Sequence, residues 1–138
     1  MPKIKYCLDT NVVSDLLRGI PNVVANFNRA RNNNDTIFVD SIVYYEIVRG
    51  LQNPQHKRRL EQFRWLYDRL EHLYFDRDNM RALDKAAEIY DQLRKGRNVE
   101  DSDIFIAAIA MVNGCTLVTA NEQHFSRIEG LRYVNWRS

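Results

Sequence analysis

Three acidic residues lie where strand-like segments give way to helix-like segments, and together they could bind a metal ion. Asp9 follows a short apolar stretch, Glu46 lies in an otherwise apolar helical segment, and Asp103 begins another apolar helix. Carboxylates at about 4 Å repel each other by roughly 4 kcal/mol at an effective dielectric constant of about 20. A bound cation offsets that repulsion. If these side chains meet, the sequence therefore predicts a cation site.

The ligand types indicate both the ion and the reaction. Oxygen ligands favour a hard ion, Mg²⁺ or Mn²⁺, over zinc, and none of the three histidines has the spacing of a ligand pair. Such an ion can bridge a phosphate and activate a water molecule, so hydrolysis of a phosphodiester bond is the chemistry that fits. We expect Asp9 and Asp103 to hold the ion and Glu46 to orient or deprotonate the attacking water.

Alternating strand and helix patterns explain how distant acids could converge. Strands are predicted at residues 4–8, 36–39, 116–118 and 131–134. Helices are predicted to begin near Asn11, at Pro21, after a cap at Ser41, at Asn53, at Asp78 (ending at Gly96) and at Ser102. In open parallel sheets the functional crevice lies beyond the carboxyl ends of the strands. Asp9, Glu46, Asp103 and Asn121 all map to that edge.

Length and composition predict a single domain over residues 1–138. The alternation of strands and helices predicts that this domain is α/β, with a short parallel sheet flanked by helices. The net charge of +2 allows a nucleic-acid partner without requiring one. Cys7 and Cys115 stand in apolar segments, so we expect buried core residues in a reducing cytoplasm. No apolar run approaches the ~20 residues of a membrane helix, so we expect a cytoplasmic protein without a membrane partner.

Each candidate residue also fits an ordinary structural role. An aspartate after a strand is commonly a helix cap, which applies to Asp9 and Asp103 alike. Arg49 could pair with Glu46 across one helical turn, and Asn121 could cap the short turn that follows it. Local sequence alone leaves these alternatives open.

Four segments in order resemble the motifs of PIN-domain nucleases, and most closely those of the VapC-type toxins. They are residues 8–11, 41–50, 103–110 and 117–121 with Phe125, and the resemblance covers nearly the whole chain, although residues 55–75 carry no motif. It implies a PIN-like three-layer α/β/α fold and a magnesium- or manganese-dependent endoribonuclease that acts on RNA. It also implies a homodimer that a cognate antitoxin inhibits.

The resemblance also implies roles for individual residues. Asp9 and Asp103 match the principal metal ligands, Glu46 matches the second acidic residue, and Asn11 and Thr119 match polar residues that support the site. Asn121 departs from the pattern, because many members carry an aspartate there or close by. The number of bound ions, one or two, therefore stays open. Three nearby acids are candidate substitutes: Glu122, Asp101 and Glu100.

Two other functions stay open at this stage. A catalytically degenerate PIN-like module that binds nucleic acid or regulates is favoured by Asn121 at the position of an acid. A phosphatase on a doubly wound sheet would use Asp9 as a nucleophile. The Asp9-Thr10-Asn11 segment lacks the second aspartate that such phosphatases usually place two residues further on.

The middle of the chain is rich in basic residues and contains one unusual tryptophan. The basic residues could form an electrostatic track for RNA, or an ordinary solvated helix face: Arg49, Lys57, Arg58, Arg59, Arg64 and Arg69. Trp65 falls off the apolar face of its predicted helix. An antitoxin or a second subunit could cover it.

Overall fold

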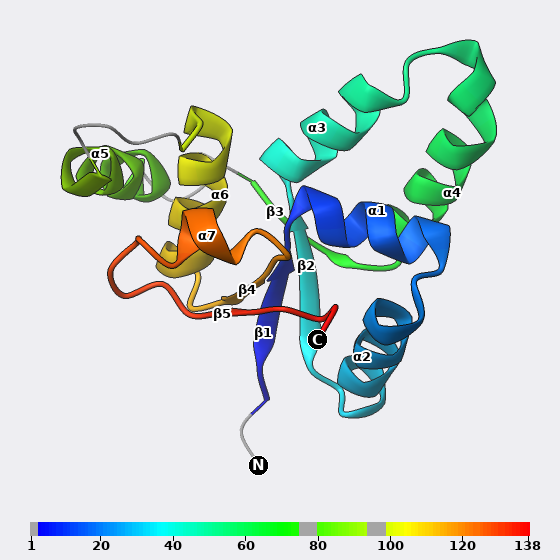
Figure 1. Ribbon diagram of the computed structural model, residues 1–138, viewed down its shortest axis with the longest axis horizontal. Coiled ribbons are helices and arrows are strands. Elements are labelled where there is room, and N and C mark those ends of the chain that lie inside the picture. The colour runs from blue at the N-terminus through cyan, green and yellow to red at the C-terminus, as the bar shows by residue number, and fades with distance from the viewer. Residues whose placement is uncertain (1–2, 75–79, 94–98) are drawn as a thin grey trace.

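The computed structural model describes residues 3–74, 80–93 and 99–138, and its centre is a five-stranded sheet in which every pairing is parallel (Figure 1). The strand order is β3-β2-β1-β4-β5. The strands are β1 (Lys5–Leu8), β2 (Thr36–Asp40), β3 (Glu71–Leu73), β4 (Thr116–Val118) and β5 (Tyr133–Val134). The direction of strand addition reverses at β1, which places the topological switch point between β1 and β4.

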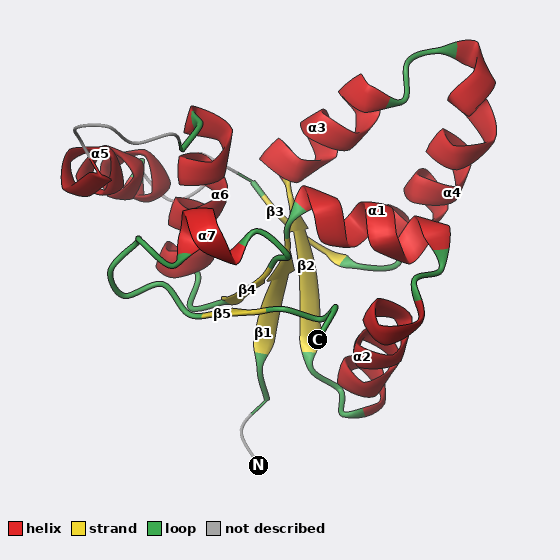
Figure 2. Cartoon of the chain, viewed as in Figure 1, coloured by secondary structure: helices red, strands yellow, loops and turns green. Residues whose placement is uncertain are grey.

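Helices cover both faces of this sheet, as the sequence predicts. Figure 2 shows α1, α2 and α4 on one side and α5, α6 and α7 on the other, while α3 extends from the carboxyl end of β2. This division follows from right-handed crossovers that move in opposite directions along the sheet. The helices are α1 (Thr10–Arg18), α2 (Pro21–Asn32), α3 (Ser41–Gly50), η1 (Pro54–His56), α4 (Lys57–Asp68), α5 (Arg81–Leu93), α6 (Asp101–Val112) and α7 (Glu122–Phe125).

Helix α6 forms much of the core because small and branched apolar residues let it lie close to its neighbours. Its residues 106–110 are fully buried, and it packs against α5 and β4. Phe63 from α4 and Phe125 from α7 are also fully buried. Cys7 and Cys115 are buried free cysteines, which confirms their prediction as core residues, and burial raises the pKa of both thiols.

Two helix starts show how capping works in this chain, and one corrects a prediction. Asp9 caps α1 by accepting the backbone N–H of Thr10. The cap of α3 is Asp40, whose side chain accepts the N–H of Val43, so the predicted cap at Ser41 is wrong by one residue. An aspartate at the end of β2 satisfies an otherwise unpaired donor of the first turn, and Ser41 becomes the first helical residue.

Several boundaries differ from the predicted ones. The long helix predicted from Asn53 is divided into η1 and α4, with the Asn53 side chain capping η1. Strand β3 contains polar residues at an edge, which hides it from hydrophobic patterning, and β5 covers only two residues. The predicted helix limits at Asp78 and Gly96 lie outside the described residues. None of the helices in the described ranges has the length and apolarity needed to cross a membrane.

Candidate active site

Asp9 lies at the switch point of the sheet and is almost completely buried, with 4% of its surface exposed. Its backbone N–H donates to the carbonyl of Val118 at 2.9 Å, which ties the end of β1 to the end of β4. One carboxylate oxygen accepts the N–H of Thr10 at 2.8 Å, and the other accepts the hydroxyl of Thr119 at 2.7 Å. Asp9 is therefore held in one orientation by two donors, one at the start of α1 and one just after β4.

The surroundings of Asp9 disfavour its negative charge. The pKa of Asp9 is raised to about 6: burial is the largest cause, the negative charges of Asp103 and Glu46 add to it, and the hydrogen bonds from Thr119 and Thr10 oppose it. The three acids predicted to form the site are thus near enough for their charges to act on one another.

Asp103, in the first turn of α6, has a histidine as its partner. Its Oδ2 atom lies 3.3 Å from Nδ1 of His124, and the same Nδ1 lies 2.8 Å from the side-chain amide of Asn121. Burial raises the pKa of Asp103, the His124 contact lowers it, and the charges of Glu46 and Glu100 raise it. Sequence reasoning missed His124, because its contact with Asp103 joins residues 21 positions apart.

Glu46 is linked to the start of α1 rather than buried in an apolar helix face. Its Oε1 atom accepts the hydroxyl of Thr10 at 2.5 Å, and Thr10 is the residue that follows Asp9 in the chain. The alternative ion pair with Arg49 is present but long, at 3.9 Å, and Arg49 is largely exposed. Because solvent screens such a pair, Arg49 leaves Glu46 available to the site.

The three predicted supporting residues also meet at this edge. Asn11 accepts the backbone N–H of Ala120 at 3.2 Å, and the hydroxyl of Thr119 accepts the backbone N–H of Asn121 at 2.9 Å. Asn121 is the N-cap residue of α7, as its structural alternative predicts, but its side chain makes no capping hydrogen bond there. Its side chain instead contacts His124.

The candidate substitutes for a fourth acid differ in their surroundings. Glu100 precedes α6, and its charge raises the pKa of Asp103. Glu122 accepts a hydrogen bond from the side chain of Asn135 at 3.0 Å.

The donor set fits a hard cation by its chemistry, although the three carboxylates stand apart from one another. Within residues 3–74, 80–93 and 99–138, no three His, Cys, Asp or Glu side chains are close enough to hold a metal ion as they stand. Each acid instead contacts a neighbouring group of its own, Thr119, Thr10 or His124. A cation bound among these carboxylates would offset the charge repulsion that adds to the effect of burial on the pKa of Asp9.

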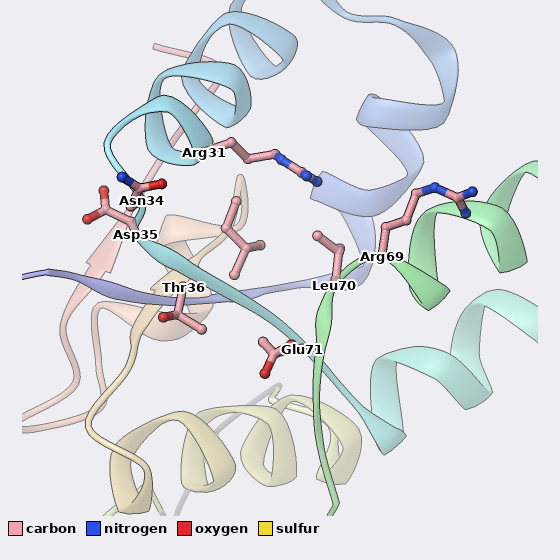
Figure 3. A pocket seen from close by; sticks show the side chains of 8 residues that line it. Arg31, Asn34, Asp35, Thr36, Arg69, Leu70 and Glu71 are labelled. Carbon is pink, nitrogen blue, oxygen red and sulfur yellow. The ribbon is translucent and has the colours of Figure 1, made fainter.

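A separate pocket lies at the opposite edge of the sheet. Figure 3 shows its lining by Arg31 of α2, Asp35 and Thr36 at the start of β2, and Arg69 and Glu71 at the start of β3. Its volume is about 330 Å³. Because it lies at the amino ends of the strands, away from the three acids, it is not the candidate active site.

Comparison with known proteins identifies the family. Residues 6–131 match the PIN domain. The chain is 30% identical to "Ribonuclease VapC2" of Rickettsia felis, covering 95% of this chain and 97% of that protein. It is 29% identical to the "tRNA(fMet)-specific endonuclease VapC" of Shigella flexneri, covering 96% of this chain and 98% of that protein.

Solved structures agree with these sequence matches. The VapBC2 complex of Rickettsia felis, bound to a DNA fragment from its promoter, superposes with a TM-score of 0.83 at 28% identity, covering 96% of this chain and 99% of that one. The DNA-bound VapBC of Salmonella typhimurium also gives 0.83, at 30% identity, with 96% and 98% covered. The family match, the relatives and the shared fold thus agree, and the chain belongs to the PIN-domain family, within its VapC ribonuclease group.

Proposed function

We propose that this chain is a divalent-metal-dependent endoribonuclease and the toxin of a toxin–antitoxin pair, with Asp9, Glu46 and Asp103 as its catalytic acids. The observation that carries the proposal is the surroundings of Asp9. It is a buried carboxylate at the sheet's switch point, held by Thr119 and Thr10, and its pKa is raised by burial and by the two other acids. A structural cap would not need two further acids beside it.

The three acids would have different roles, according to their positions. Asp9 and Asp103, which begin or precede helices at the sheet edge, would hold Mg²⁺ or Mn²⁺, with Glu46 as a third ligand. When bound, the ion would stabilise negative charge developing on the phosphate and make water a stronger nucleophile. Glu46 is half-buried, so it can reach solvent and orient or deprotonate the attacking water. Asn11, Thr119 and Asn121 would hold the carboxylates and the loop after β4 in position through their hydrogen bonds.

The proposed products are a 5′-phosphate and a 3′-hydroxyl. They follow if the water held by Glu46 attacks phosphorus and the 3′ oxygen leaves.

The relatives support the proposed partners. Solved VapBC structures similar to this chain contain a second protein beside the toxin. We propose that this chain likewise binds a cognate antitoxin that inhibits it, and that two copies of the chain form a homodimer. Trp65 is 60% exposed on α4 and could be covered in either assembly.

Cleavage of total cellular RNA tests the activity. The wild type, Asp9→Ala and Asp103→Asn would each be incubated with magnesium, with manganese and with chelator, after circular dichroism has verified folding. Discrete fragments that require both metal and the two aspartates are the expected result. Sequencing of the fragment ends would identify the bond that is cleaved. Equal cleavage by wild type and variants would contradict the proposal.

A second function is worth testing because of Asn121. A catalytically degenerate PIN-like module that binds nucleic acid or regulates is favoured by this amide at the position of an acid, and by the separation of the three carboxylates within the described ranges. That alternative predicts RNA binding by the folded wild type without cleavage under any metal condition.

A further inference from the structure

Two adjoining pockets form a groove that begins at the candidate active site. The inner pocket, of about 350 Å³, is lined by Thr10 and Glu46, and the outer one, of about 600 Å³, lies along α1 and α4. Figure 1 shows α3 and α4 as two arms of an arch, with α1 across its open side. Both pockets are lined by Leu17, Arg18, His56 and Arg59. We call these two adjoining pockets together the α1–α4 groove.

The α1–α4 groove carries net positive charge, with three arginines in its lining against the one carboxylate of Glu46. Arg18 and Arg59 line both pockets, and Arg58 lines the outer one; all three are exposed. In the part of the chain that the structure describes, none of these three guanidinium groups forms an ion pair. Arg137, by contrast, pairs with the buried Asp15 at 2.6 Å. Unpaired arginines that share one groove create a local positive potential that attracts anions.

Other basic residues of the middle helices have different surroundings. The guanidinium of Arg69 lies 3.7 Å from the centre of the Trp65 ring, and it donates to the Trp65 carbonyl at 2.8 Å. Arg64 lies on α4 but lines neither pocket of the groove. Of the six basic residues singled out in the sequence, only Arg58 and Arg59 line the groove. Arg18, at the end of α1, lines it as well and was not among those six.

We propose that the α1–α4 groove binds the backbone phosphates of the RNA segment that adjoins the cleaved bond, with Arg18 and Arg59 as its phosphate-contacting residues. This inference rests on the proposed ribonuclease function. The scissile phosphate must lie against the acids, and the inner pocket joins Glu46 directly to Arg18 and Arg59. A strand seated at the acids therefore meets these arginines at its neighbouring phosphates. A guanidinium group can donate two hydrogen bonds to the oxygens of one phosphate. Such contacts position the RNA backbone but do not depend on the base sequence.

RNA binding by charge-neutralised variants tests this groove. A short fluorescein-labelled single-stranded RNA of mixed sequence would be titrated with protein in chelator, so that no cleavage occurs, and binding would be followed by fluorescence anisotropy. Arg18→Gln and Arg59→Gln should each weaken RNA binding about 5- to 10-fold at low salt. Each should also reduce the slope of log affinity against log salt concentration by about 1, the value for one lost phosphate contact. Arg64→Gln, on the same helix as Arg59, is the matched control and should bind as the wild type does.

Two results would overturn the inference. The first is wild-type affinity in both groove variants. The second is an equal loss in Arg64→Gln, since that would mean a general charge effect. If the first result came with weakened binding of the cognate antitoxin, the groove would be a protein-docking surface instead.

A cleavage assay on the same proteins separates this inference from the proposed function. With metal present, the groove variants should raise KM and keep kcat, because they lose phosphate binding but no group at the reacting atoms. A wild type that cleaves no RNA would contradict the ribonuclease proposal, while the anisotropy comparison would still decide whether the groove binds RNA. A wild type that cleaves, with an unchanged KM in both variants, would contradict the groove alone.

Discussion

Asp9 and Asp40 occupy equivalent places in the fold, yet their surroundings differ. Each stands where a strand of the sheet meets its helix, each caps that helix, and each is buried. Asp40 is completely enclosed, with the N–H of Val43 at 2.8 Å and the thiol of Cys7 at 3.5 Å as its partners. The pKa of Asp40 is raised to about 7, mainly by burial, and the charge of Asp9 adds to the rise. Its contacts are those of a structural cap.

Asp9 differs because distant segments of the chain converge on it. Thr119 from the end of β4 donates to it, and the charges of Asp103 and Glu46 raise its pKa. The local pattern of a strand, an aspartate and a helix therefore produces a structural cap in one place and a candidate metal ligand in another. Convergence at the topological switch point separates the two roles.

The largest predicted difference between the two aspartates is in catalysis. Asp9→Asn should reduce RNA cleavage by more than about 100-fold, because it removes a proposed metal ligand and not merely a supporting group. Asp40→Asn keeps a capping side chain and should stay within about 3-fold of wild-type activity. Both would be measured on one RNA under identical metal conditions. Similar losses of cleavage activity in the two variants would contradict the different roles assigned to Asp9 and Asp40.

A smaller effect is expected from the donor that holds Asp9. Thr119→Val keeps the shape of the side chain but removes the hydroxyl that bonds Asp9 and accepts the N–H of Asn121. Cleavage should fall about 10-fold, as is usual when a partner of a metal ligand is lost. Thr116→Val, within β4 itself, is the control. Unchanged activity in Thr119→Val, with folding verified, would show that Thr119 does not position Asp9.

The pH dependence of the free energy of unfolding should reveal the raised pKa of Asp40. Its pKa is about 7 in the folded protein against 3.8 for the ordinary group, so the folded state holds a proton that the unfolded chain has released. Stability from this group is therefore complete below about pH 4 and is lost as the pH rises towards 7, by at most about 1.4 kcal/mol per pH unit. Asp9 adds a dependence of the same sign up to about pH 6.

Urea unfolding in chelator between about pH 5 and 8 would measure that dependence. The wild type should lose stability as the pH rises, and Asp40→Asn should lose about 1 to 2 kcal/mol less over the range from about pH 5 to 7. Parallel pH profiles for the two proteins would mean that Asp40 does not carry a raised pKa.

The smallest predicted effect concerns the amide at Asn121. Asn121→Asp would add a carboxylate next to His124, which contacts Asp103, and should raise the affinity for Mn²⁺ a few-fold by adding charge near the proposed ligands. Asn32→Asp, at the far end of α2, adds the same charge away from the site. Equal effects of the two substitutions in a calorimetric titration would exclude a role for position 121.

Hydrophobic patterning predicts the order of most strands and helices and places Asp9, Glu46 and Asp103 at one edge. It also places Asn121 there, and the family resemblance adds Asn11 and Thr119, in agreement with the hydrogen bonds at that edge. The successes of patterning have one cause, since in parallel α/β sheets the residues after the strands share an edge.

Other features lie beyond sequence patterning because they depend on contacts between distant residues. The ion pair of the buried Asp15 with Arg137 joins positions 122 residues apart, and the His124 contact with Asp103 spans 21. Asp40 has the same local pattern as Asp9, so only three-dimensional packing distinguishes them. Strand β3 is polar at the sheet edge, where burial imposes no alternation.

Manganese binding distinguishes the two aspartates without any knowledge of the natural RNA. Electron paramagnetic resonance of Mn²⁺ would be recorded during titration with the wild type, Asp9→Asn and Asp40→Asn, each verified as folded. The convergence of three acids at the switch point predicts that the wild type and Asp40→Asn bind the ion alike, while Asp9→Asn loses most of its affinity. Equal Mn²⁺ binding by all three proteins, or a loss of affinity only in Asp40→Asn, would contradict the assignment of Asp9 as a metal ligand.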